Sequence, residues 1–151
     1  MKRFTFVILL VFLAGGLSAQ QPARESVNPS LIFSAGYVPK SSYNAIKFGA
    51  TVNDLLFERF GAYVSLETGV DSDYFRNLYG ITGRVHDNFY LWGGIDLFSK
   101  GGLFTKGFNA RKEIGVTYVP HPNLALKLGY SLQVGVSAQI GFRIPLMYVR
   151  D

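Results

Sequence analysis

Charged side chains that could do chemistry lie within segments where polar and apolar residues alternate. They are Lys47, Arg59, Glu67, Arg84, Asp96, Arg111, Glu113, Lys127 and Arg143. Alternate residues of a strand point to the same face of a sheet, and glycines recur on this face near the charged residues. Because both signs are present, the set could form ion pairs in a confined space or line a water-filled pore. We predict a paired cluster.

The residue types give no indication of metal or cofactor chemistry. The sequence has no cysteine and two histidines, His86 and His121. Neither histidine has a second ligand at a spacing typical of metal sites, so we predict no metal site and no cofactor. The glycine-rich segment GGLFTKG, residues 101–107, lacks the Lys-Ser/Thr ending of a phosphate-binding loop. We interpret it as a flexible loop.

The N-terminal residues have the layout of a secretory signal peptide. Lys2 and Arg3 precede an unbroken apolar run over residues 4–13, and small residues lead to an expected cleavage site after Ala19. A helix of this run would span about 15 Å, against a hydrocarbon core of about 30 Å, so it is too short for a membrane anchor. We expect residues 1–19 to be a signal peptide, residues 20–29 a short flexible segment and residues 30–151 one domain.

Eight segments of this domain alternate polar and apolar residues over about the length of a tilted membrane strand. They cover residues 30–38, 44–53, 57–68, 77–86, 89–98, 110–119, 124–133 and 136–146. Most short connections alternate with longer ones rich in Gly, Ser, Asp and Lys, an arrangement typical of an up-and-down meander. We predict an all-β, eight-stranded antiparallel up-and-down barrel, with no helix after the signal peptide.

The apolar face of such a barrel could meet either its own core or lipid. This face carries almost no charge, and its exceptions, Glu58 and Lys112, fall at strand ends. Aromatic residues also gather near the strand ends, as in the girdles of membrane barrels, and glycines on the polar face would make room for long side chains in a narrow bore. These features favour a transmembrane β-barrel with the charged cluster inside. The alternative is an exported soluble barrel, lipocalin-like, that binds an apolar ligand.

The last strand carries a sharper motif. The residues QIGFRIPL place Gln139, Gly141, Ile144 and Leu146 in the pattern of the insertion signal of small outer-membrane barrels. With the strand number and the leader, the chain resembles the eight-stranded OmpA/OmpX-like superfamily of Gram-negative bacteria over residues 30–146. The resemblance implies residence in the cell outer membrane and recognition of this strand by the barrel-assembly machinery. Pro145 and the residues after Leu146 depart from the family pattern.

The resemblance also frames the functional alternatives. Some barrels of this size are lipid A deacylases that use a His and a Ser two residues later, but after His121 the second position is Asn123, which cannot act as the nucleophile. We therefore predict no enzymatic activity, with a lipid-modifying outer-membrane enzyme as the second alternative. The expected role is structural or interactive at the cell surface.

The expected partners follow from the location. They are outer-membrane lipid and lipopolysaccharide, whose phosphates Lys100 and Lys106 could contact. The formal net charge of +5 could suggest nucleic acid, but the lysines and arginines are scattered singly and export is expected, so we predict no nucleic-acid partner. The sequence indicates no other protein partner.

Overall fold

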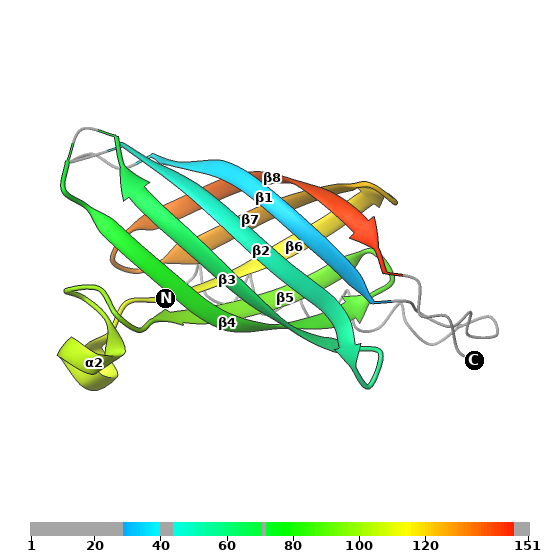
Figure 1. Ribbon diagram of the computed structural model, residues 1–151, viewed down its shortest axis with the longest axis horizontal. Helices are drawn as coiled ribbons and strands as arrows, with labels where there is room; N and C mark the ends of the chain where they lie inside the picture. Colours follow the sequence, from blue (N-terminus) through cyan, green and yellow to red (C-terminus); the bar gives the residue numbers. More distant parts are fainter. Residues whose placement is uncertain (1–28, 40–43, 71, 147–151) are drawn as a thin grey trace, which may run out of the picture.

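The computed structural model describes residues 29–39, 44–70 and 72–146 (Figure 1). Within them the chain forms eight strands. They are β1 (Ser30–Pro39), β2 (Asn44–Leu56), β3 (Phe60–Gly69), β4 (Phe75–His86), β5 (Phe89–Asp96), β6 (Lys112–His121), β7 (Leu124–Ser131) and β8 (Gly135–Pro145). The predicted signal peptide and all but the last residue of the predicted lead-in lie outside the described residues.

The strands close into one antiparallel barrel in sequence order, as predicted. Each strand pairs with its neighbour along the chain, and β1 pairs with β8 to close the ladder, from Ser30 opposite Pro145 to Tyr37 opposite Ala138. Closure leaves no strand with an unpaired edge. Figure 1 shows the tilted strands as a single cylinder.

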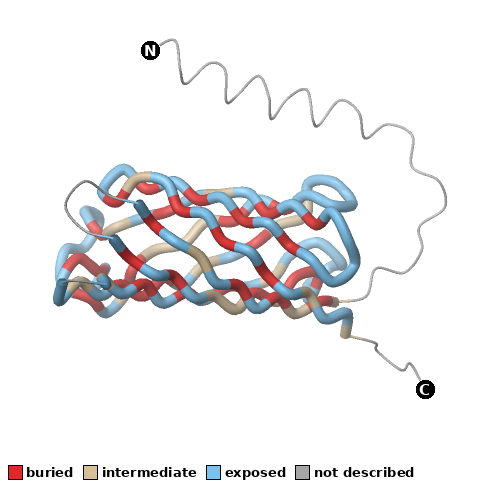
Figure 2. The backbone as a smooth tube through the Cα atoms, turned by 90° about the horizontal axis from the view of Figure 1, so that it is seen from above, coloured by how far each residue is buried: buried red, intermediate tan, exposed pale blue. Residues whose placement is uncertain are grey.

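Alternation in the sequence becomes alternation between the bore and the outer wall. In β7 every second residue is buried, beginning with Ala125 and including Lys127, while Leu126 and Leu128 are exposed. Figure 2 shows the same exchange of buried and exposed positions along the strands. The period of two therefore sends the polar set inward and the apolar set outward.

The β2–β3 connection differs from the sequence prediction. The third strand begins at Phe60 rather than at residue 57, because Phe57 and Glu58 form a turn with φ angles of 53° and 55°. Consecutive positive φ angles are typical of a type I′ hairpin turn. Neither residue is an Asn or a Gly, the types that usually mark such a turn, so the alternating pattern alone gives too long a strand.

The connection between β5 and β6 contains two short helices, so the prediction of no helix after the signal peptide was wrong. They are α2 (Leu103–Lys106) and η2 (Gly107–Asn109). The glycine-rich segment folds back on itself here, and Gly107 adopts a φ of 55° that other residues rarely take. No described helix is long and apolar enough to cross a membrane.

Glycines on the inner face let large side chains fill the bore. A Cβ atom on Gly129 would collide with Glu113 and lie 2.7 Å from Cη2 of Trp92. By contrast, a Cβ atom on the outward-facing Gly93 would lie 3.8 Å from its nearest neighbour, a methyl group of Ile114. The interior thus depends on particular glycines, whereas the wall tolerates a larger residue.

We expect Gly129→Ala to lower the free energy of unfolding by about 1–3 kcal/mol, because overpacking displaces the side chains around it. The matched control Gly93→Ala should leave stability unchanged or slightly raised, since Ala suits a strand better than Gly. Urea unfolding in detergent micelles, followed by fluorescence of Trp92, the one tryptophan of the chain, measures both. Equal stability of the two variants would contradict this packing assignment.

Candidate functional site

The barrel interior is mainly polar. Among the described residues, the buried polar and charged side chains outnumber the buried apolar ones. The largest include Lys47, Glu67, Arg76, Glu113 and Lys127, each at most 2% exposed. A charge in a space that excludes water is costly unless it is paired, so the contacts among these five decide whether the interior is stable.

Glu113 is the centre of the ionic network. Its Oε1 accepts hydrogen bonds from Nζ of Lys47 at 2.5 Å and from Oγ of Ser137 at 2.7 Å. Its Oε2 accepts from Arg76, and Nη2 of Arg76 also donates to Oε2 of Glu67 at 3.0 Å. These residues come from five different strands, so the network links walls that are distant around the barrel.

Lys127 is held differently. Its Nζ donates to Oγ1 of Thr51 at 2.9 Å and forms no ion pair with a described residue. Two aromatic rings lie close to it instead, with centroids 5.1 Å away for Tyr63 and 5.3 Å for Trp92. The ammonium group therefore gains cation–π stabilisation, about 2 kcal/mol per ring where the cation is desolvated.

An aromatic pair is buried inside the barrel. The rings of Tyr63 and Trp92 meet edge to face, with centroids 4.9 Å apart. Lys47 also lies over Trp92, at 5.4 Å, so this indole is flanked by two cations. The central network is thus three cations, two carboxylates and two aromatic rings.

A second polar cluster lies near the β2–β3 turn. Asp54 accepts a hydrogen bond from the Tyr90 hydroxyl at 2.8 Å and is 3.3 Å from Nε of Arg84. Arg84 also donates to the carbonyl oxygen of Glu58, which belongs to the turn. These contacts tie the turn with positive φ angles to β4 and β5.

The structure divides the predicted charged cluster into separate groups. Lys47 contacts Glu113 directly, Glu67 joins them through Arg76, and Lys127 lies beside the same aromatic pair. The other predicted residues lie elsewhere: Arg84 pairs with Asp54, Asp96 accepts a hydrogen bond from Ser99, Arg111 lies 5.3 Å from the Tyr74 ring and Arg143 donates to the Pro122 carbonyl at 3.5 Å.

Arg59 does not belong to the interior. It is exposed and lies in the turn after Glu58, so its predicted place inside the barrel was wrong. The cause is the misplaced start of the third strand, since residues before Phe60 do not follow the inward and outward alternation of the strand.

Sequence reasoning missed two important members, Arg76 and Asp54. Both were assigned to connections, although β4 begins at Phe75 and β2 continues to Leu56. Arg76 has the same parity as Leu78 and Thr82, which face the bore, so extending the alternating pattern by two residues would have found it.

The predicted insertion signal is divided between the two faces of the barrel. Gln139 and Gly141 are buried, and Oε1 of Gln139 accepts from Oγ of Ser34 at 2.9 Å. Ile144 is exposed on the outer wall, and the backbone N–H of Leu146 donates to the Pro29 carbonyl at 2.7 Å. Recognition of these residues during assembly stays a prediction.

The described residues contain no group of three His, Cys, Asp or Glu side chains that could hold a metal ion. His121 accepts a hydrogen bond from the backbone N–H of Asn123 at 3.4 Å, as part of its own turn. The buried carboxylates Glu67 and Glu113 are both engaged with cations. The arrangement is a buried network of ion pairs that links several strands.

Strand topology and this buried network define the class: a closed eight-stranded antiparallel up-and-down barrel with an ionic core. No protein-family model matches the chain, and no curated protein matches its sequence. Among solved structures, it is similar to Ail, the attachment invasion locus protein of Yersinia pestis, solved in complex with the heparin analogue sucrose octasulfate. The identity is 14% and the TM-score 0.48, over 78% of this chain and 97% of that chain.

A de novo designed transmembrane β-barrel is also similar. Its identity is 15% and its TM-score 0.48, over 83% of this chain and 100% of the designed chain. At these identities, both similarities concern the fold alone.

We expect Glu113→Gln to lower the free energy of unfolding by about 3–5 kcal/mol, because it leaves two buried cations short of a partner. Glu58→Gln, at an exposed turn position, is the control and should change stability by less than about 0.5 kcal/mol. Urea unfolding in micelles measures both variants.

The double variant Lys47→Met, Glu113→Gln completes the test. It should lose less stability than the sum of its two single variants, since it removes one cation together with its partner. Additive losses would show that Lys47 and Glu113 are not coupled.

Proposed function

We propose that the protein is an integral outer-membrane β-barrel with a non-catalytic structural or surface-interaction role. The observation that carries this proposal is the inverted distribution of side chains, polar inside and apolar outside. Ile81, Ile114 and Ile140 are 71%, 65% and 66% exposed on three different strands. A soluble monomer rarely exposes so large an apolar surface, whereas a closed barrel in lipid requires one.

Aromatic side chains near both ends of the strands support a position across a bilayer. Phe89 and Tyr118 stack with ring centroids 4.6 Å apart near the short turns. Tyr79 meets Phe98 edge to face at 5.6 Å near the longer loops. Aromatic rings at two levels, with an aliphatic band between, are the girdles of outer-membrane barrels.

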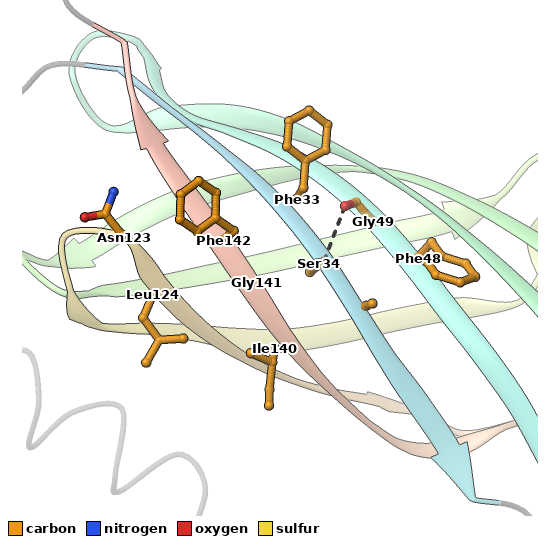
Figure 3. A pocket seen from close by; sticks show the side chains of 10 residues that line it. Phe33, Ser34, Phe48, Gly49, Asn123, Leu124, Ile140, Gly141 and Phe142 are labelled. Atoms are coloured by element: carbon orange, nitrogen blue, oxygen red, sulfur yellow. Dashed lines mark hydrogen bonds between the residues drawn. The ribbon is translucent and has the colours of Figure 1, made fainter.

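The surface over β1, β2 and β8 supports the same orientation. A shallow groove there is lined by Phe33, Phe48, Ile140 and Phe142, which project from the wall away from the bore (Figure 3). Acyl chains of lipid can fill such a groove without any specific partner. A lipocalin-like barrel would instead place its apolar lining inside, where this protein has Lys47, Glu113 and Arg76.

The ionic core also affects whether ions could pass through the bore. Eight strands enclose a space that side chains can fill, and here the Tyr63–Trp92 pair and the cations around it occupy its middle. We infer that the bore does not conduct ions at rest. A structural or surface role follows more readily from this interior than a porin-like role.

Membrane insertion is tested by a charge placed on the apolar wall. Ile81→Arg should destabilise the folded barrel in lipid vesicles by about 2–4 kcal/mol, as expected near the middle of a bilayer. Leu132→Arg is the matched control, because Leu132 is 83% exposed in the tight β7–β8 turn, which the proposed orientation places outside the membrane. Equal effects, or release of the wild-type protein as a soluble periplasmic species by osmotic shock, would refute the proposal.

Closure of the bore is tested in planar bilayers. The purified wild-type protein should produce no steady single-channel steps, because side chains of the ionic core occupy the bore. Bilayers treated with detergent alone serve as the control. Steady steps of uniform size would show that the core leaves a permanent pore.

A further inference from the structure

The β5–β6 connection, residues 97–111, contains the short helices α2 and η2. It exposes Phe98, Phe104 and Phe108, which are 62%, 74% and 93% exposed. Figure 1 shows α2 beyond the end of β5, outside the cylinder of strands. A group of exposed aromatic side chains is typical of a surface that contacts a membrane or a partner.

The rings of Tyr79, Phe98 and Phe104 form an aromatic ridge that begins on the barrel wall. Phe98 contacts Tyr79 of β4 edge to face at 5.6 Å and stacks on Phe104 of α2 at 5.3 Å. The ridge therefore continues the outer aromatic girdle onto the loop. Such a continuation places the loop at the level of the lipid headgroups rather than high above the membrane.

The segment that carries the ridge has basic residues and no acidic residue of its own. From residue 97 to residue 112 the sequence has four cations, Lys100, Lys106, Arg111 and Lys112, and no Asp or Glu. Arg111 lies against the Tyr74 ring. Lys100 and Lys106 are exposed, and neither forms an ion pair with a described residue. Two cations beside an aromatic ridge complement an anionic lipid headgroup.

The loop is built to hold this shape. Ser99 donates to Asp96 and its Oγ accepts from the N–H of Gly101 at 3.2 Å, while Thr105 donates to the Ser99 carbonyl at 3.2 Å. A Cβ atom on Gly102 would come within 2.5 Å of the Leu97 carbonyl oxygen, so the close turn requires glycine. A preformed loop loses little conformational entropy when it binds.

We propose that residues 97–111 bind the phosphorylated headgroup of lipid A, the membrane anchor of lipopolysaccharide. The aromatic ridge packs against acyl chains, and Lys100 and Lys106 each contact a phosphate group. Two separate lysines match a headgroup with two phosphates better than a phospholipid with one. This inference rests on the proposed outer-membrane location, which places the longer loops at the leaflet that contains lipopolysaccharide.

The test titrates bis-phosphorylated lipid A into the full chain, folded in neutral detergent micelles, and measures affinity by calorimetry. Lys100→Gln and Lys106→Gln should each weaken binding about fivefold, and the double variant about thirtyfold, at about 1 kcal/mol per lysine. Arg59→Gln is the matched control, because it removes an exposed cation from the opposite end of the barrel. Unchanged affinity of the double variant would overturn the proposal.

Two further comparisons identify the headgroup and the ridge. Monophosphorylated lipid A should bind wild type about fivefold more weakly than the bis-phosphorylated form, and the double lysine variant should no longer distinguish them. Phe104→Ser should weaken the binding of both lipids by the same factor. Phe57→Ser, at the far turn, should leave both affinities unchanged. Equal affinity of wild type for phosphatidylglycerol micelles and for lipid A would overturn the lipid A assignment.

Failure of this proposal is separable from failure of the outer-membrane proposal. Each variant is first tested for a heat-dependent mobility shift and for flotation with phosphatidylcholine vesicles. If wild type does not float, the membrane location itself is wrong. If wild type floats and shows no preference for lipid A, only the headgroup site is wrong.

Discussion

Eight strands enclose only enough space for side chains, and this limit governs the inner face of the barrel. Large side chains such as Glu113, Tyr63 and Trp92 fit because glycines on other strands leave space for them. Gly129 makes room for Glu113 and for the edge of Trp92, and Gly94 makes room for Tyr63. The glycines and the charged residues are therefore two parts of one packing solution. Neither would be explained by strand propensity, which disfavours glycine.

Ion pairs across the bore then have consequences for the wall. Because Glu113 on β6 contacts Lys47 on β2 and Arg76 on β4, the network fixes distances that the backbone ladder alone would leave adjustable. A purely apolar core of this volume could be as stable, since buried ion pairs often contribute little net free energy. It would, however, give the inner and outer faces the same character. A shift of the strand register by one residue would move these charged side chains to the outer wall, so a charged inner face disfavours that register.

The strand framework was largely predictable from the sequence, and the central contacts were only partly so. Alternation identified all eight strands and the sides to which Lys47, Glu67, Glu113 and Lys127 point, because a period of two is a local property. Strand ends depend on turns, and the turn at Phe57 and Glu58 uses residues that do not mark one. Arg59 and Arg76 were misplaced for this reason. Which cation meets which carboxylate depends on barrel closure, a non-local property that alternation does not encode.

The position of Lys127 shows how the interior accommodates an excess cation. Three cations and two carboxylates cannot all pair one to one, and Lys127 is the cation that lies between aromatic rings. A third carboxylate would balance the charge but would fill less space than an aromatic ring, whereas Tyr63 and Trp92 offer negative ring faces and also fill part of the interior. The same two rings thus stabilise the unpaired ammonium group and fill space in the interior. Water in an open channel would hydrate Lys127 instead, so the contact of this ammonium group with two rings is the arrangement expected where water is excluded.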